Sequence, residues 1–478
     1  MWYIYCISLQ VFNIFLLISG HLKASIEILV ARIEQKGRRR CKPGYKADDY
    51  TKRKDYFGMK AKINLWIVLF FLTAVSPLHA EESVSWEQCT SEAKRAHPDL
   101  STALALLQQA EADKQVTGGS RLPQLSLSVS SIENGTSGLG SSVLSSYALS
   151  AQQLLYDGGK TSNQIASNTE VINAAQYNYD AVSANVRFAL RSAFTQLLKA
   201  QDLVGLASEI AERRQNNVRL ISLRYQGGRE HIGSLRQAEA DLAQAQFEVS
   251  QAKRGLVLAQ TILASALGRD MHQPLRVQGA LKVSDLTERK PDLAWLAKNH
   301  PLFQQLDTKS KAARFDLDAS RSAFSPQLYL TSSVGRGTYD RLPTDAANWS
   351  AGVTVSVPIY EGGSGRARVA KASAVLSQQN ALEKSGYLLL YNALEQSWKS
   401  FQDARQLVLV QNKQLLAASE RSKIANAQYS NGLVTFNDWV IIENNLVNAK
   451  KNYLNAEADM LLAEAQWIQS KGGALEGQ

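Results

Sequence analysis

The chain has 478 residues and a formal net charge of +10, which at first suggests a phosphate-rich partner. The charge is uneven, however: residues 1–58 contain 11 Lys and Arg against 5 Asp and Glu, whereas residues 81–478 contain 40 basic and 38 acidic residues. Because nucleic-acid binding depends largely on neutralising phosphates, this nearly neutral body argues against nucleic acid as a partner. The length allows two or three ordinary domains or one long repeat.

A candidate export signal lies at residues 59–80. Two lysines precede an apolar core at residues 65–72, and Ala80 is a small residue in front of two glutamates. This order of parts is typical of a secretory signal peptide, so we expect cleavage after Ala80. A membrane anchor is the alternative, but the apolar run is short for a membrane span. Residues 1–58 are then expected to be an upstream extension absent from the mature protein, with Met59 as the true start; a genuine N-terminal anchor is the alternative for this segment.

The residue types used in catalysis do not cluster in this sequence. Only Cys89 follows the signal, so the mature chain has no partner for an internal disulfide. The six histidines make no His-Glu-Xaa-Xaa-His motif. Residues 158–161 read Gly-Gly-Lys-Thr, but a phosphate-binding loop requires glycine at the position of Leu154. We therefore predict that the protein is not an enzyme and has no cofactor and no metal site.

The mature chain begins with a helical pattern from Trp86 to about Gln115, interrupted at His97-Pro98. Proline suits the first turn of a helix, and the residue before it suits the cap. We therefore expect His97 to be a boundary residue rather than a ligand.

Two strands are predicted after this helix. From residue 125 to residue 130 apolar side chains alternate with serines, and a second alternation ends at Tyr-Asp-Gly-Gly, residues 156–159. A period of two residues is the pattern of a strand, and a strand of about ten residues is long enough to cross a membrane at a tilt. A loop rich in Gly and Ser, residues 134–142, joins the two strands into a predicted hairpin.

Long helices are predicted next. Proline, which breaks helix interiors, is absent from residues 124–273 and again from residues 359–478. Residues 160–226 keep a heptad seam of apolar and small side chains, which favours a coiled coil. A tip containing Gly228 follows, and residues 234–267 return as a second helix.

The second half of the chain repeats the first at an offset of about 204 residues. The matching motifs are Leu122-Pro123 with Ser325-Pro326, Tyr156-Asp157-Gly158-Gly159 with Tyr360-Glu361-Gly362-Gly363, and Tyr225 and Gly228 with Tyr429 and Gly432. Similarity at a fixed offset indicates an internal duplication. We predict a first repeat at 81–267, a linker at 268–291 and a second repeat at 292–478.

The alternating strands have two interpretations. Apolar side chains on one face and Ser, Thr or Gly on the other fit a transmembrane β-strand, but a soluble sheet with one solvated face alternates in the same way. If the strands cross a membrane, four of them cannot close a barrel, and lipid does not tolerate an open edge, so copies must associate. No apolar run in residues 81–478 is long enough for a transmembrane helix, so the long helices are expected in the aqueous periplasm.

These motifs, in this order, resemble the TolC family of outer-membrane efflux and secretion channels. The resemblance rests on the duplicated order, the strand exits ending in Gly158-Gly159 and Gly362-Gly363, and the two Tyr-Xaa-Xaa-Gly tips. It covers essentially all of residues 81–478. Each motif alone is weak, whereas their order and spacing together are specific.

The resemblance implies an α+β membrane protein that forms a homotrimer. Four transmembrane β-strands per chain would build a twelve-stranded barrel in outer-membrane lipid, and the antiparallel coiled-coil helices would form a periplasmic α-barrel. The protein would be the passive exit duct of a tripartite efflux or type I secretion system, joined through a periplasmic adaptor to an inner-membrane transporter. The alternative is a periplasmic coiled-coil structural or tethering protein without a pore.

The resemblance also assigns roles to residues. Tyr225 and Gly228 in the first tip, and Tyr429 and Gly432 in the second, match the turns that dock the adaptor. Asp438 matches an acidic constriction position, where a ring of three carboxylates would favour cations. Capping of the helix that starts nearby is the alternative role of this aspartate.

The chain departs from well-studied members of that family at three matching positions, which carry Ser234, Val434 and Ile441. These residues do not supply the ion-pair lock and the second acidic ring found in those members. Residues 229–231 (Arg-Glu-His) are candidates for other tip contacts, with a solvated charged turn as the alternative.

Overall fold

The computed structural model describes residues 82–137, 140–269, 274–281, 289–339 and 347–475. The upstream extension and the signal peptide expected within residues 1–80 lie outside these residues. So do parts of the linker and of the loops at the outer ends of the hairpins.

The first half follows the predicted order. Helices α3 (Trp86–Ala96) and α4 (Pro98–Gly119) meet at His97, whose side chain accepts a hydrogen bond from the Asp99 amide at 3.2 Å. His97 is therefore a helix cap, as predicted. Strands β2 (Gln124–Thr136) and β3 (Gly140–Tyr156), the long helix α5 (Lys160–Gln226) and the returning helix α6 (Ile232–Leu267) complete this half.

The second half has the same succession of elements. It contains α7 (Leu293–Asn299), α8 (Pro301–Ser322), β5 (Gln327–Tyr339), β6 (Ala347–Ser356), α9 (Ser364–Ser430) and α10 (Phe436–Ser470). Helices α5 and α9 both have 67 residues, as proline-free runs between glycine turns permit.

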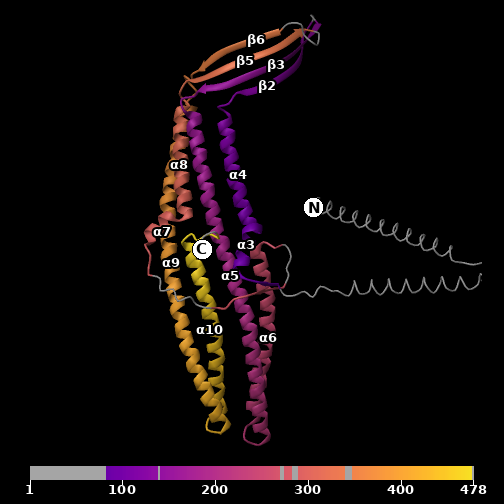
Figure 1. Ribbon diagram of the computed structural model, residues 1–478, viewed down its shortest axis with the longest axis vertical. Helices are drawn as coiled ribbons and strands as arrows, with labels where there is room; N and C mark the ends of the chain where they lie inside the picture. The colour runs from indigo at the N-terminus through magenta and orange to yellow at the C-terminus, as the bar shows by residue number, and fades with distance from the viewer. Residues whose placement is uncertain (1–81, 138–139, 270–273, 282–288, 340–346, 476–478) are drawn as a thin grey trace, which may run out of the picture. The chain divides into compact units, whose positions relative to one another are not determined.

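The four long strands form one antiparallel sheet in the order β2-β3-β5-β6 (Figure 1). Strands β2 and β6 are its two edges. The expected length of about ten residues was wrong for three strands: β2 and β5 have 13 residues and β3 has 17. The alternation that predicted these strands marks only the segments where apolar side chains occupy one face, and pairing continues beyond them.

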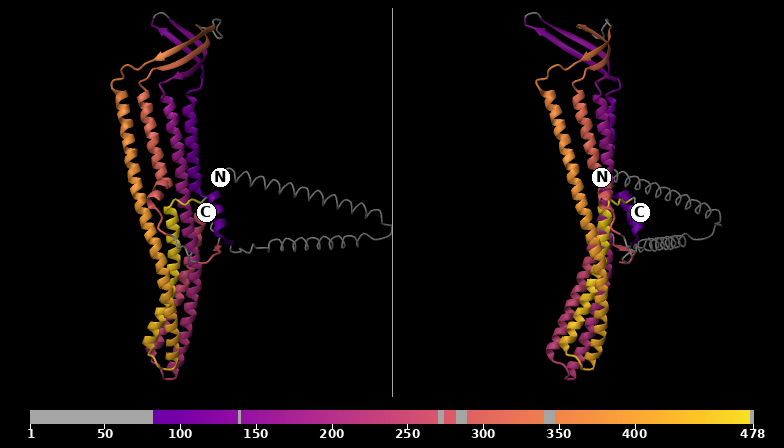
Figure 2. Two further views of the ribbon diagram at one scale, coloured as in Figure 1. Left: turned by 60° about the vertical axis from the view of Figure 1, so that its left-hand side comes forward. Right: turned by 90° about the vertical axis from the view of Figure 1, so that its left-hand side faces the viewer.

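Within residues 82–475 the sheet lies at one end of the helices and the two helical tips lie at the other, as the views in Figure 2 show. Below the sheet, α4, α5, α8 and α9 run side by side; toward the tips, α5, α6, α9 and α10 do so. Buried alanines in α6 recur every seven residues, at positions 238, 245, 252 and 259. Such small residues let the paired helices approach closely, as the predicted heptad seam requires.

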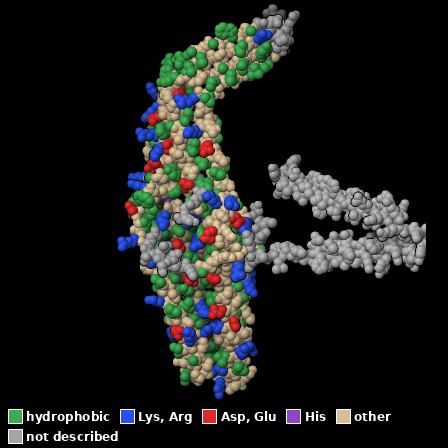
Figure 3. All heavy atoms as spheres, viewed as in Figure 1, with side chains coloured by type: hydrophobic (Ala, Val, Ile, Leu, Met, Phe, Trp, Pro, Cys, Tyr) green, Lys and Arg blue, Asp and Glu red, His purple; other side chains and the backbone are tan. Residues whose placement is uncertain are grey.

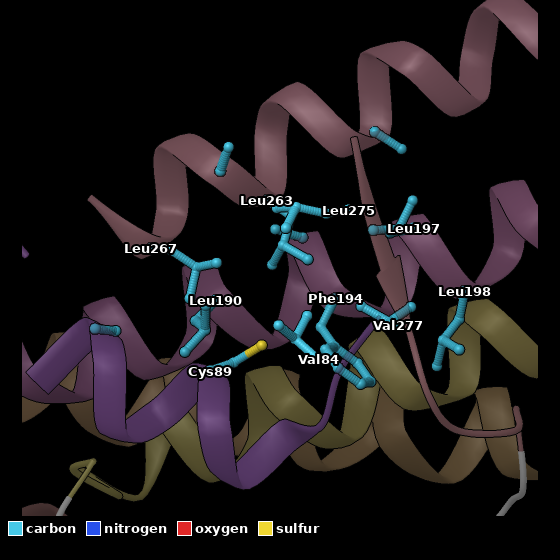
Figure 4. Packing of buried hydrophobic residues seen from close by; sticks show 14 of the residues in the cluster. Val84, Cys89, Leu190, Phe194, Leu197, Leu198, Leu263, Leu267, Leu275 and Val277 are labelled. Atoms are coloured by element: carbon cyan, nitrogen blue, oxygen red, sulfur yellow. The ribbon is translucent and has the colours of Figure 1, made fainter. Parts of the chain in front are cut away.

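A second, small sheet lies about midway along the helices. Strand β1 (Glu82–Val84) pairs in parallel with β4 (Leu275–Val277), which lies in the predicted linker, where no strand was expected. Both strands have three residues, too few for a period to appear in the sequence. Their side chains join the largest buried apolar cluster, in which Cys89 and Phe194 also lie (Figure 4).

Candidate functional site

One face of the large sheet is apolar and exposed. Its exposed apolar side chains include Leu125, Leu127 and Val129 on β2, Leu149 on β3, Leu330 and Val334 on β5, and Trp349, Val353 and Val355 on β6. Val129 is 76% exposed, and in Figure 3 hydrophobic side chains cover much of the visible sheet while charged ones gather on the helices. A contiguous apolar face of this kind marks a surface that meets lipid or another protein.

The opposite face of the sheet is polar. Serine hydroxyls meet across neighbouring strands there: Ser130 and Ser146 lie 2.8 Å apart, as do Ser333 and Ser350. Where this face meets the helices there is a cavity of about 590 Å³, lined among others by Gln124, Gln152, Gln327, Tyr329 and Lys160. Polar amide and hydroxyl groups therefore follow one side of the sheet down to the first turn of α5.

The strands pass into the long helices through paired glycines. Gly158 and Gly159 have φ of 66° and 83°, and Gly362 and Gly363 have φ of 60° and 85°. This left-handed backbone favours glycine, and two such residues in succession turn each strand into its helix. At the first of these two glycine turns, the carboxylate of Asp157 accepts hydrogen bonds from the amides of Gly159 and Thr161 at 3.1 and 2.7 Å and so caps α5.

The two helical tips also turn at left-handed glycines, Gly228 with φ of 71° and Gly432 with φ of 76°. The two tyrosines assigned to these tips differ in their surroundings. Tyr225 is exposed, whereas the side chain of Tyr429 is only 1% exposed. Tyr429 therefore packs in the interior of its tip, and the exposed apolar side chain of that tip is Leu433.

Tyr429 connects the second tip to the first. Its ring stacks on Trp439 with the ring centroids 4.4 Å apart, and the guanidinium of Arg224 lies 4.6 Å from the centroid of the Tyr429 ring. Its hydroxyl donates to the carboxylate of Glu230 at 2.8 Å. Arg224 also donates to the Tyr429 carbonyl at 2.9 Å. These contacts join the end of α9 to the α5–α6 turn.

Glu230 is the polar centre of the first tip. It accepts a second hydrogen bond from the Ser234 hydroxyl at 2.9 Å, while His231 caps α6 by accepting from the Ser234 amide. Burial works against ionisation of Glu230, but the hydrogen bonds from Tyr429 and Ser234 outweigh it, so the pKa of Glu230 is lowered. Burial and the hydrogen bond to Glu230 raise the pKa of Tyr429.

Asp438 lies in the first turn of α10 and is exposed. Its amide donates to the Thr435 hydroxyl at 3.2 Å, and that hydroxyl donates back to its carboxylate at 2.7 Å. These are the contacts of a helix cap, the alternative role considered for this residue. A role in a constriction depends on other copies of the chain and stays a prediction.

Above the tips, a buried ion pair joins α5 to α10. The guanidinium of Arg213 donates to both carboxylate oxygens of Glu443, at 2.6 and 2.9 Å, and the Ser422 hydroxyl of α9 donates to the same group at 2.6 Å. Glu443 is 1% exposed. Burial opposes its ionisation, but the hydrogen bonds from Arg213 and Ser422 prevail, so the pKa of Glu443 is lowered.

Sequence reasoning did not find these pairings. Glu230 was named only as a candidate for tip contacts, and Arg224, Trp439 and Glu443 were given no role. The available signal was a charged or aromatic side chain on an apolar helix seam, as Glu443 is. Its partner Arg213 is 230 positions away, and only the packing of two helical pairs brings them together.

Among the described residues, no helix is both long and apolar enough to cross a membrane. Nor do three or more His, Cys, Asp or Glu side chains gather in that part of the chain as a metal site would require.

The family model of outer membrane efflux proteins matches residues 89–269 and 295–473. Among similar proteins, protein CyaE of Bordetella pertussis is 22% identical over 52% of this chain and 54% of its own length. Outer membrane protein OprJ of Pseudomonas aeruginosa is 28% identical over 43% of this chain and 42% of its own length. The matched region thus spans about half the length of these two relatives.

The fold is similar to that of solved outer-membrane channels. The open state of the MtrE outer membrane channel of Neisseria gonorrhoeae superposes with a TM-score of 0.73, at 19% sequence identity, over 81% of this chain and 89% of that one. The chain belongs to the outer membrane efflux protein family, as the resemblance predicted. It is an outer-membrane protein that extends into the periplasm.

Proposed function

We propose that three copies of this chain form a passive exit duct across the outer membrane, as part of a tripartite efflux or type I secretion system. Each chain contributes four strands to a twelve-stranded barrel, with the apolar face toward lipid and the polar face toward the lumen. The long helices continue this barrel as an α-helical tube through the periplasm. A periplasmic adaptor and an inner-membrane transporter supply the substrate and the energy.

The observation that carries the proposal is the sheet with two free edges and opposite polar and apolar faces. A strand edge carries unpaired backbone N–H and C=O groups, and in lipid each unpaired group costs several kcal/mol. Edge strands β2 and β6 therefore need partners, and bacterial barrels contain at least eight strands. Three copies provide twelve, the number expected from the resemblance.

The tips are proposed to meet the adaptor. Gly228 and Gly432 set the two turns, and the exposed apolar side chains at the tips include Tyr225 and Ile232 on the first and Leu433 on the second. Since the hydroxyl of buried Tyr429 links the tips, this residue acts by holding the mouth in one conformation rather than by touching the adaptor. An adaptor that binds Tyr225 and Leu433 is positioned to separate the tips.

Single-channel conductance in planar lipid bilayers tests the duct. The protein, extracted as an oligomer from outer membranes, should give discrete current steps. Because tips that are joined also block current, the same recording is made with Tyr429→Phe and Glu230→Gln together, which removes the hydrogen bond between the hydroxyl of one tip and the carboxylate of the other. A folded oligomer that conducts in neither form contradicts the proposal and supports the periplasmic tethering protein instead.

A further inference from the structure

The two hairpins of the sheet are equivalent, yet their second strands end differently. Gln124 pairs with Gln152 at the base of the first hairpin, and the residues at the matching offsets, Gln327 and Ser356, pair at the base of the second. Beyond this point β3 continues to Tyr156, whereas β6 stops at Ser356. Residues 357–360, which match residues 153–156, lie outside the sheet.

The cause of the difference is the neighbour on the other side. Residues 153–156 are held only by β5, which pairs Gln153 with Leu330 and Tyr156 with Leu328 across a bulge. Strand β6 has no such neighbour, because it is an edge of the sheet. Its continuation therefore lacks the strand that orders its counterpart.

The side chains of this continuation are unusually exposed. Ile359 and Tyr360 are 95% and 87% exposed, whereas their counterparts Leu155 and Tyr156 are 49% and 55% exposed. Two apolar side chains in succession at this level of exposure indicate a surface that a partner covers.

The following glycine turn shows the same contrast. A Cβ on Gly158 would lie 2.2 Å from the Cβ of Ser325, so this turn presses against the start of β5. A Cβ on the matching Gly362 would meet nothing within 4 Å. The residue that corresponds to Ser325 is Leu122, at the start of β2, the other free edge of the sheet.

We infer that β2 of a second copy pairs with β6 and extends it through residue 360, in the register that the β3–β5 contact has within one chain. This inference rests on the proposed ring of copies and specifies how they join. Within one chain, Ala151 of β3 lies opposite Ser332 of β5, and Gln153 lies opposite Leu330. The matching residues, 204 positions after those of β3 and 203 positions before those of β5, place Val355 opposite Val129 and Val357 opposite Leu127 of the next copy. Tyr360 then lies opposite Leu125 of the next copy, and Gly362 lies against its Leu122.

Two independent features agree with this register. It places apolar side chains opposite apolar ones on the lipid-facing side, whereas a slip by one residue would bring Val355 opposite serine. It also places Pro358 next to the bulge, since β3 has its irregularity between Leu154 and Tyr156. Proline lacks the N–H of a regular ladder and is tolerated at bulges.

Disulfide trapping between copies tests the register. Val355→Cys is combined in one chain with Val129→Cys, the predicted opposite, or with Leu127→Cys or Ser131→Cys, each shifted by two residues. Directly opposite residues lie within the Cα distance that a disulfide needs, whereas diagonal neighbours are too far apart. Under oxidation the first pair should give disulfide-linked dimers and larger oligomers, up to the closed ring, that disappear on reduction. The shifted pairs and each single variant should give little cross-linked product.

The outcomes separate this inference from the proposed function. Efficient trapping of a shifted pair, or none in any pair while the oligomer still conducts, overturns the register and leaves the duct intact. If the protein without cysteine substitutions formed no oligomer, both the register and the proposed duct would be contradicted. Failure of one cysteine pair to fold is recognised by loss of the oligomer under reducing conditions, and Thr354→Cys with Ser130→Cys, the next pair in the same register, then replaces it.

The glycine turn gives a second, independent measurement. Gly362→Ala places a Cβ where the next copy's chain should approach, as Gly158 meets Ser325. Gly363→Ala carries a similar left-handed backbone cost, but its counterpart Gly159 has nothing within 4 Å of a Cβ. Gly362→Ala should therefore lower the dissociation temperature of the oligomer more than Gly363→Ala does. Equal effects would contradict the inferred contact.

Discussion

The hydroxyl of Tyr429 donates a hydrogen bond of 2.8 Å to the carboxylate of Glu230, although the two residues are 199 positions apart. This contact joins the two helical tips of a single chain. Tyr429 comes from the end of α9 and Glu230 from the turn between α5 and α6, so separating the helical pairs must break it.

Tyr429→Phe should loosen the tips without unfolding them. The phenyl ring keeps the stack on Trp439, while the hydrogen bond to an ionised carboxylate, worth about 1.5–3 kcal/mol, is lost. We expect longer open times in single-channel recordings. Tyr225→Phe, on the exposed tyrosine of the other tip, is the matched control and should leave open times unchanged. Identical recordings from both variants would show that the tip link does not limit opening.

Acid should weaken the same link. The pKa of Glu230 is lowered from 4.5 in the folded chain, so the carboxylate contributes stability above pH 4.5 and loses it as the pH falls below that value. Channel opening should therefore increase below pH 4.5. In Glu230→Gln this added opening should be absent, because the side chain no longer titrates. A wild-type response that survives this substitution would assign the pH effect to another group.

Glu443→Gln should destabilise the helices above the tips. Removing the charge from a buried pair leaves Arg213 with a neutral partner, and breaking such pairs costs about 3–5 kcal/mol. The partial exposure of Arg213 favours the lower end of this range. Loss of helical circular dichroism on heating measures the effect. The control is Asp403→Asn, which breaks the exposed pair with Lys399 and should change stability by less than about 1 kcal/mol. Similar shifts in both variants would contradict a special role for the buried pair.

How far the sequence predicts this structure depends on the range of each interaction. Helix α5 begins and ends at the predicted residues because proline-free sequence and left-handed glycines act locally. Strand β4 escaped prediction because three residues carry no period. The link between Tyr429 and Glu230 depends on how two helical pairs lie against each other, which neither local sequence reports.

The two roles of Asp438 can be separated by changing its neighbour. Thr435→Ala removes the hydroxyl that caps α10 and should cost about 1 kcal/mol of stability, while the carboxylate stays in place. Asp438→Asn removes the charge and keeps a polar side chain. If three such carboxylates narrow the mouth, cation selectivity should fall in Asp438→Asn and persist in Thr435→Ala. Reversal potentials in a salt gradient measure it. Unchanged selectivity in both variants would show that Asp438 acts only as a helix cap.

The direction of the sheet can be tested with two neighbouring residues of β6. Val353 lies on the apolar face and Thr354 on the polar face, and both are exposed in the single chain. An arginine on the lipid side of a barrel costs about 2–4 kcal/mol at mid-membrane depth, whereas one in the lumen stays hydrated. Val353→Arg should therefore reduce the amount of oligomer in outer membranes. Thr354→Arg should assemble normally and shift the selectivity of the pore toward anions.

Together these two variants decide which face meets lipid, because the same side chain is placed at the same depth. Heat-modifiable oligomer in membrane fractions measures assembly, and reversal potentials measure selectivity. If Val353→Arg assembles and Thr354→Arg does not, the polar face is the buried one and the proposed barrel is inverted. If both assemble without any change in selectivity, the sheet does not line a pore, and the tethering protein becomes the better account of the fold.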